Sequence, residues 1–211
     1  MTKSLKSLYS AFACFKTTVV FFLLTTTVAS SQVSQKQTIS FSSDTSKVNQ
    51  LFRDYRTVAN QNPDSAIGMV NEALALSKSN SYTYGEINAL RLSADLFSLI
   101  AQYDTALLIL DQAYELAKTN NDPKSIVNIY NLRGNILLDK GNYEGAIICY
   151  KKVLSFSNQI EYASGIAKGY ANLGVGYYLI GDYARAIDYY NEAIPYIETL
   201  KKIQSKYGNY S

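Results

Sequence analysis

Three short segments, each forty residues after the one before, decide the fold: Gln102-Tyr103-Asp104-Thr105-Ala106, Asn142-Tyr143-Glu144-Gly145-Ala146 and Asp182-Tyr183-Ala184-Arg185-Ala186. A weaker copy lies forty residues before the first of them, at 62–66, and keeps the alanine. A fixed period of this size is typical of a repeat array, in which each unit packs only on its neighbours. The sequence therefore predicts a solenoid rather than a domain with one central core.

Apolar residues recur at helical spacing within each period, and polar or glycine-containing breaks interrupt them twice. The last segment shows the clearest apolar stripe, formed by Tyr183, Ala186, Ile187, Tyr190, Ala193, Ile194, Ile197 and Leu200. The breaks predict eight helices, at about 46–59, 63–79, 82–100, 103–119, 123–139, 143–158, 162–180 and 183–202. We expect an all-α, right-handed α-solenoid of about four antiparallel helix pairs, and we call the two helices of each pair A and B.

Residues 171–186 read Ala-Asn-Leu-Gly-Val-Gly-Tyr-Tyr-Leu-Ile-Gly-Asp-Tyr-Ala-Arg-Ala. This segment resembles a tetratricopeptide repeat, whose pattern has Leu-Gly and then Tyr in helix A, a Gly-x-Tyr turn, and small residues in helix B. The small residues have a steric reason, because they let two helix backbones approach closely. The resemblance covers about 46–203. Its period exceeds the usual length of roughly 34 residues, which implies longer helices.

The N-terminal residues 1–30 combine three lysines, an uncharged apolar stretch and small residues at Ala29 and Ser30. This order is typical of a secretory signal peptide with cleavage near Ser30 or Ser31. The apolar stretch is too short and too rich in threonine to cross a membrane. We therefore expect an exported protein, periplasmic or extracellular, with no stable membrane span after cleavage. A flexible polar linker at 31–45 and a repeat domain at 46–211 would follow.

Charge and composition exclude several classes of function. Lys3, Lys6 and Lys16 lie in the leader, and removing them from the 20 basic residues leaves 17, equal to the 17 acidic residues. A neutral body disfavours binding to nucleic acid. The chain has no histidine, which excludes Ser-His or Cys-His catalysis and a histidine-ligated metal. We expect no enzyme activity and no catalytic, cofactor or metal site, and we expect Cys149 to act as a small apolar residue.

The resemblance also implies a binding face. In tetratricopeptide proteins the concave groove is lined by A-helix residues one turn apart, which here are Asn88, Arg91, Asp95, Asn128, Asn131, Asn135, Lys168 and Tyr178. Asparagine side chains can donate to and accept from the main chain of an extended peptide. A merely hydrated polar face is the alternative. Arg91, Asn131 and Lys168 partly match the carboxylate clamp of some family members, but the charge of Asp95 would repel a ligand carboxylate, and we expect no clamp.

Tyrosine is abundant, at 19 residues. Many tyrosines occupy core positions of the family pattern, whereas Tyr178, Tyr189 and Tyr196 should lie off the buried stripe. Exposed tyrosines are good binding anchors, because they offer a large contact area at a small entropy cost.

The leading hypothesis is a non-enzymatic exported scaffold that binds a protein or an extended peptide through the concave face of its A helices. An alternative is the input segment of a longer signalling protein, as in some bacterial sensor kinases. A third is self-association through the last helix pair, which no further A helix follows in this sequence. In that pair, either residues 203–210 fold back as a cap or the array continues elsewhere.

Overall fold

The computed structural model describes residues 44–59 and 61–207. The regular secondary structure of these residues is entirely helical. A first helix covers 44–58, so it already includes the last two residues of the expected linker. The expected signal peptide and the rest of that linker lie outside the described residues.

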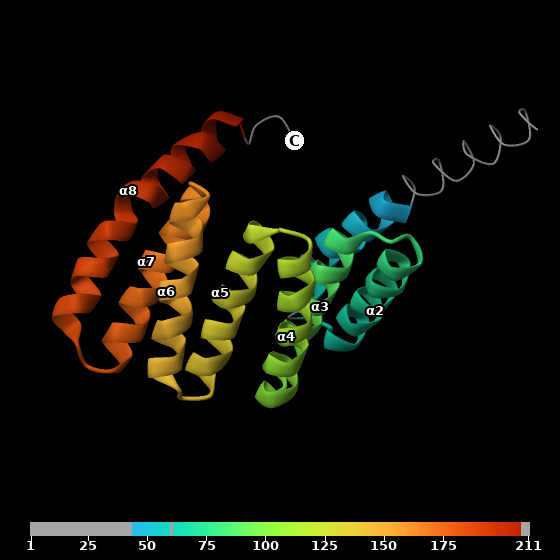
Figure 1. Cartoon of the computed structure of the whole chain (residues 1–211), viewed down its shortest axis with the longest axis horizontal. Coiled ribbons are helices and arrows are strands. Elements are labelled where there is room, and N and C mark those ends of the chain that lie inside the picture. Colours follow the sequence, from blue (N-terminus) through green and yellow to red (C-terminus); the bar gives the residue numbers. More distant parts are fainter. Residues whose placement is uncertain (1–43, 60, 208–211) are drawn as a thin grey trace, which may run out of the picture. The chain divides into compact units, whose positions relative to one another are not determined.

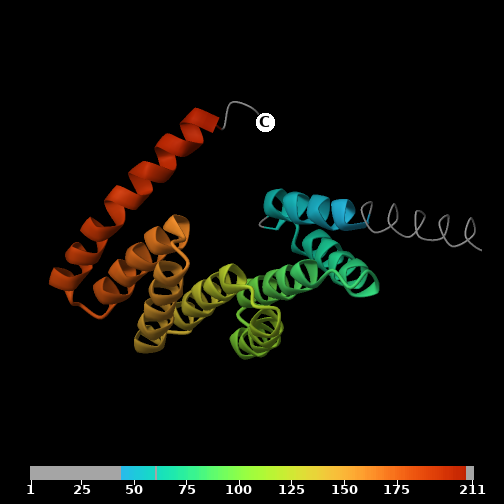
Figure 2. The same ribbon diagram turned by 45° about the horizontal axis from the view of Figure 1, so that its top comes forward.

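Seven more helices follow the first (Figure 1): α2 (Pro63–Ser79), α3 (Thr83–Leu99), α4 (Tyr103–Thr119), α5 (Pro123–Asp139), α6 (Tyr143–Gln159), α7 (Ala163–Leu179) and α8 (Tyr183–Tyr207). The expected boundaries agree with these within two residues, apart from the end of α8. That helix continues five residues beyond the expected end at 202, and its last turns project past α7 (Figure 2).

The described residues from 47 onward form one unit, in which each helix from α2 onward packs on its neighbours in the sequence. The A helices also contact one another directly, α3 with α5 and α5 with α7. The first helix joins the array through Val48, Phe52 and Tyr55, which share a buried cluster with residues of α2 and α3. The predicted all-α solenoid of antiparallel helix pairs is confirmed.

The turns recur every twenty residues. One residue in each turn has a positive φ angle, at Ser81 (53°), Ala101 (59°), Asn121 (51°), Gly141 (82°), Glu161 (52°) and Gly181 (82°). The next backbone N–H then donates to a carbonyl five residues back, as from Asn142 to Leu137 at 2.8 Å. This is the left-handed ending that commonly terminates a helix, where glycine is favoured. Identical turns give six consecutive helices the same length of 17 residues.

Several helices begin at a side-chain cap. The side-chain oxygens of Asn62, Asp122 and Asn142 each accept a hydrogen bond from the backbone N–H three residues later. Such caps satisfy one of the N–H groups that a helix start leaves without an internal partner. The polar breaks seen in the sequence therefore start helices as well as interrupt them.

The two helices of a pair approach most closely where helix A has a small residue. A Cβ atom at Gly134 would collide with the ring of Tyr150, and one at Gly174 would collide with the ring of Tyr190. In the preceding pair the corresponding residues are Ala94 and Leu110, both completely buried. The smaller residue thus occurs opposite the larger partner, as the steric interpretation of the small residues requires.

The apolar stripe of α8 is only half covered. Ala186 and Ala193 are buried, but four large residues of the stripe are exposed: Tyr183 (60%), Ile187 (59%), Tyr190 (38%) and Ile194 (49%). The residues that correspond to Ile187 and Tyr190 in α6 are Ile147 and Tyr150, which are buried. The expected alternative of a cap formed by residues 203–210 is wrong for the described residues, because α8 remains helical to Tyr207 and Ile203 is 51% exposed.

Replacing Ala101 by glycine should raise the free energy of unfolding by about 1 kcal/mol. A Cβ atom in the left-handed region costs about 1–2 kcal/mol, part of which the greater freedom of glycine in the unfolded chain offsets. The check is the midpoint of urea unfolding. Gly141→Ala is the matched control, because a Cβ at Gly141 would meet nothing within 4 Å. It should lower the midpoint by a similar amount, and two unchanged midpoints would contradict the strain argument.

Candidate functional site

All eight residues expected to form the binding face lie on three neighbouring A helices: Asn88, Arg91 and Asp95 on α3, Asn128, Asn131 and Asn135 on α5, and Lys168 and Tyr178 on α7. Asn135, Lys168 and Tyr178 are exposed and the others are half-buried. None belongs to the buried core. We call the first seven of these residues the A face, and Tyr178 is described separately below.

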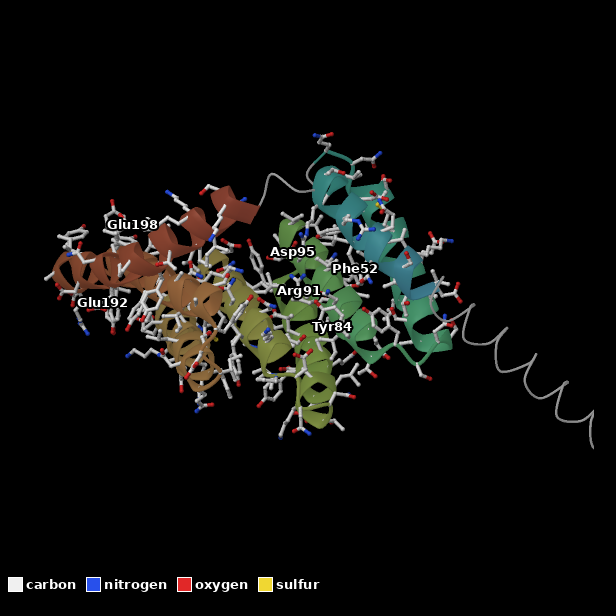
Figure 3. All side chains as sticks on the ribbon, turned by 90° about the horizontal axis from the view of Figure 1, so that it is seen from above. Phe52, Tyr84, Arg91, Asp95, Glu192 and Glu198 are labelled. Carbon is white, nitrogen blue, oxygen red and sulfur yellow. The ribbon has the colours of Figure 1, made fainter. Side chains whose placement is uncertain are left out.

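On α3, the A face holds a charged pair fixed by hydrogen bonds. The hydroxyl of Tyr55, on the first helix, donates to Oδ2 of Asp95 at 2.9 Å. The guanidinium of Arg91 donates to Oδ1 of Asn88, from Nε at 3.3 Å and from Nη2 at 3.1 Å. Figure 3 shows Arg91 and Asp95 together on this helix, with Phe52 of the first helix nearby. Asp95 is therefore held by the array and is not left as an isolated charge.

Burial changes the proton affinities of this group. It raises the pKa of Tyr55, and the neighbouring charge of Asp95 raises it further. Burial lowers the pKa of Arg91, while Asp95 acts in the opposite direction. The three residues are thus electrostatically coupled at the α3 end of the A face.

On α5, two asparagines use their side-chain oxygens internally. Oδ1 of Asn131 accepts from Nδ2 of Asn172 on α7 at 2.8 Å, and Oδ1 of Asn135 accepts from the hydroxyl of Tyr150 at 2.9 Å. Among the described residues, neither asparagine's amide nitrogen has a hydrogen-bond partner. This part of the face therefore offers donors, which suit the carbonyl groups of a peptide main chain.

Tyr55 and Asn172 were not predicted from the sequence as part of this face. Asn172 stands where the two preceding repeats have the buried leucines Leu92 and Leu132. A polar residue at an apolar position of the repeat was the signal that could have identified it. Tyr55 carries no such signal, because only the packing of the first helix on α3 brings its hydroxyl to Asp95.

Lys168 lies beside a hollow of about 260 Å³ between α7 and α8. Its lining is mainly apolar but includes a second lysine, and it contains Lys168, Ala171, Ile197, Leu200, Lys201 and Gln204. Gln204 belongs to the part of α8 beyond the expected end of that helix. The hollow can therefore accept an apolar side chain next to a negatively charged group.

Tyr178 does not lie with this hollow. It is 57% exposed at the C-terminal end of α7, and its ring centroid is 5.5 Å from that of Tyr183 on α8. Tyr189 and Tyr196 differ from expectation, because both are half-buried. Each packs against the ring of Tyr170, at centroid distances of 6.3 and 6.1 Å. These two tyrosines serve packing, so Tyr178 alone of the three remains an exposed anchor.

No group of three or more metal-ligating side chains occurs in the described part of the chain. Cys149 is buried, as expected, and burial raises the pKa of its thiol. Of the helices described, none is both long enough and apolar enough to cross a membrane.

Residues 125–198 match the family model described as tetratricopeptide repeat. This segment has the sequence pattern of tetratricopeptide repeats. The matched segment includes the A-face residues of α5 and α7 and ends within α8. Tetratricopeptide repeats typically mediate protein–protein interaction, so the general character of the A face agrees with that of the repeats. The comparison with curated proteins returned no match for this chain.

Two solved structures resemble the array. The tetratricopeptide domain of Arabidopsis FLU is 26% identical with a TM-score of 0.51, and the match covers 56% of this chain and 98% of that domain. BtubC (BKLC) from P. vanneervenii is 17% identical with a TM-score of 0.51, and the match covers 77% of this chain and 74% of that protein. At the lower identity the likeness shows the fold alone.

The stability of the repeats should fall at alkaline pH, because burial raises the pKa of both Tyr55 and Tyr150 in the folded state. Above about pH 10 the unfolded tyrosines lose their protons while the folded ones keep them. Each residue then reduces the free energy of unfolding by up to about 1.4 kcal/mol per pH unit as the pH rises.

Urea unfolding at a series of pH values from about 9 to 11 measures this slope. The double variant Tyr55→Phe, Tyr150→Phe should show a shallower slope than the unsubstituted protein, whatever its stability at neutral pH. Leu108→Ala, at an exposed residue that carries no ionisable group, should leave the slope unchanged. An equal slope in the double variant would show that Tyr55 and Tyr150 do not cause the loss of stability at alkaline pH.

Proposed function

We propose that this chain is a non-catalytic, exported scaffold that binds a protein partner, through an extended peptide segment, along its A face. The observation that carries the proposal is the row of accessible polar side chains on three adjoining helices, α3, α5 and α7. The pattern of residues 1–30 supports export.

The chemistry of the A face favours recognition of a main chain. The amide nitrogens of Asn131 and Asn135 supply donors for carbonyl groups, whatever side chains the peptide carries. Specificity would come from the two ends. The α3 end holds the balanced pair of Arg91 and Asp95, whereas the hollow at the α7 end has lysines and apolar residues. A peptide with an apolar residue beside an acidic one fits this end.

Photo-crosslinking tests the A face directly. A photoreactive amino acid at Asn128 or Lys168 should capture a partner in the protein's own cells, whereas the same group at Lys152, exposed on α6, should not. Within the described residues, Asn128 and Lys168 make no hydrogen bond to another side chain, so replacing them should leave the fold intact.

With the captured partner in hand, the double variant Asn128→Ala, Lys168→Ala should raise the Kd by about tenfold, since each polar contact contributes about 0.5–1.5 kcal/mol. Asn158→Ala, Lys152→Ala removes the same residue types from exposed positions of α6 and should leave the Kd unchanged. If both double variants bind alike, the partner does not use the A face. If the partner also binds the triple variant Asn131→Ala, Asn135→Ala, Lys168→Ala with an unchanged Kd, the A face is not its binding site.

A second candidate function rests on the exposed stripe of α8. Its four large residues, Tyr183, Ile187, Tyr190 and Ile194, are exposed, whereas the corresponding residues of α6, which α7 follows, are buried or half-buried. Such a surface favours an input segment of a longer signalling protein, in which a further helix packs there. Alternatively, a second copy of the chain covers the same stripe, and the protein self-associates.

The intact mass of the protein from its own cells, with its N-terminal sequence, separates these candidates. A mass matching residues 31–211 is expected for a free scaffold with a cleaved signal, and a much larger mass for an input segment. Light scattering over a range of protein concentrations then tests self-association. A mass that stays monomeric would exclude it, and Ile187→Ser, Ile194→Ser should dissociate any dimer that uses α8.

A further inference from the structure

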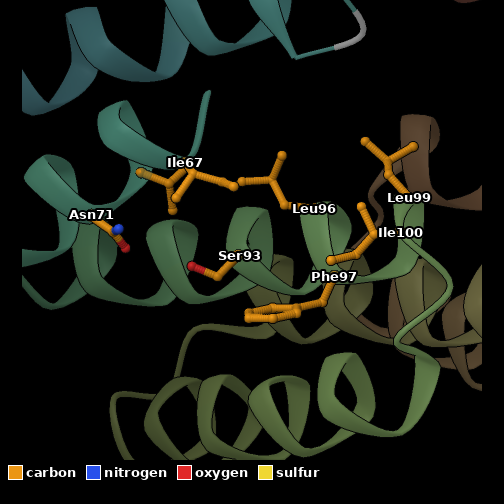
Figure 4. A pocket seen from close by; sticks show the side chains of 8 residues that line it. Ile67, Asn71, Ser93, Leu96, Phe97, Leu99 and Ile100 are labelled. Atoms are coloured by element: carbon orange, nitrogen blue, oxygen red, sulfur yellow. The ribbon is translucent and has the colours of Figure 1, made fainter. Parts of the chain in front are cut away.

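A cavity of about 170 Å³ lies between α2 and α3, away from the A face (Figure 4). Its wall is almost entirely apolar and includes Ile67 and Val70 of α2, Leu96 and Phe97 of α3, and Ile100 directly after α3. The two polar contributors are Asn71 and Ser93.

The repeat itself explains why this space is open. Forty residues after Ser93 and Asn71 stand Arg133 and Asp111, which form an ion pair that bridges α5 and α4. The long arginine side chain occupies that junction and is only 21% exposed. At the third junction the corresponding residue is Leu173, which is completely buried. Serine at position 93 is much shorter than either, so between α2 and α3 it leaves space where the other two junctions have the side chains of Arg133 and Leu173.

The rim of the cavity differs from its counterpart in the same way. Leu99 and Ile100 are each 56% exposed and Ile67 is 43% exposed. Between α4 and α5 the corresponding residues are Asp139 and Lys140, and Lys140 forms an ion pair with Asp104. Between α6 and α7 they are Leu179 and Ile180, which are less exposed, at 39% and 40%. Large exposed apolar residues around one hole are unusual on a soluble surface and typically mark an interaction site.

The size and lining of the cavity identify its occupant. An apolar protein cavity of about 150 Å³ holds one benzene ring. Figure 4 shows the ring of Phe97 lying along one side of the space, where a second ring can stack on it or meet it by its edge. A free ring would fill the hole but leave Leu99 and Ile100 in water. A ring carried by a polypeptide covers the hole and the rim together, as an anchor residue does at a protein interface.

We propose that the α2/α3 cavity is a second binding site, which receives one aromatic side chain of a partner protein. It is separate from the A face, because Ser93, Leu96 and Phe97 lie on a different side of α3 from Asn88, Arg91 and Asp95. None of the A-face residues lines the cavity.

The proposal can be tested by NMR titration of the full-length chain with four probes: N-acetylphenylalaninamide, N-acetyltyrosinamide, N-acetylalaninamide and toluene. The two aromatic amides should give saturable shifts at Ser93, Phe97 and Ile100, with a Kd on the order of millimolar, as expected for a single anchor. The alanine amide should give none. Binding of toluene without binding of either aromatic amide would mean that the cavity takes free molecules only, and would overturn the proposal.

A variant that fills the cavity can be designed from the residues found at the next junction of the same array. Asn71→Asp, Ser93→Arg transfers the ion pair of the next junction to this one and should weaken binding of the aromatic amides at least tenfold. Ser93→Leu, copying the third junction, is a second filling variant if the first is unstable. Unfolding midpoints confirm that each variant is folded. Unchanged binding in a folded, filled variant would overturn the proposal, as would shifts confined to other helices.

Discussion

The structure depends on the close contact between the two helices of each pair. Gly134 lies against the ring of Tyr150 and Gly174 against that of Tyr190. In the preceding pair the corresponding residues are Ala94 and the smaller Leu110. A solenoid has no common centre, so its stability is a sum of such neighbour contacts. A second contact of this kind joins successive pairs: Cβ atoms at Gly85 and Gly165 would collide with Ser77 and Ser157, and where the B helix has Ala117 instead, the following helix has Ser125.

The same contact between paired helices determines which side of each A helix remains accessible. Packing on helix B occupies one side of an A helix and packing on the preceding pair occupies another, so the remaining side is accessible and polar. Tyr150 links the two regions, because its ring lies on Gly134 and its hydroxyl reaches Asn135. The core therefore orients the side chain that a ligand would meet. Such support keeps a binding residue in one arrangement and lowers the entropy lost on binding.

The candidate sites occur where the repeats differ. Asn172 replaces a buried leucine and bonds to Asn131, and Ser93 replaces a bridging arginine and leaves a cavity. On α8, the large stripe residues have no covering helix among the described residues. The regular part of each repeat sets the position of its neighbours, and these local departures give each junction a surface of its own.

The sequence by itself determined the helices, their turns and their pairing, because a period of forty with alternating breaks is a local pattern that each unit repeats. The resemblance to tetratricopeptide repeats also predicted that Asn88, Asn128 and Lys168, which are forty residues apart, share one face. Only the tertiary structure decided which of these groups are already engaged. The bond from Tyr55 to Asp95 joins residues forty positions apart, and the continuation of α8 past 202 adds Gln204 to the hollow at Lys168. These features arise from contacts between units, where the depth of a cavity or the partner of a hydroxyl depends on side chains that no single repeat contains.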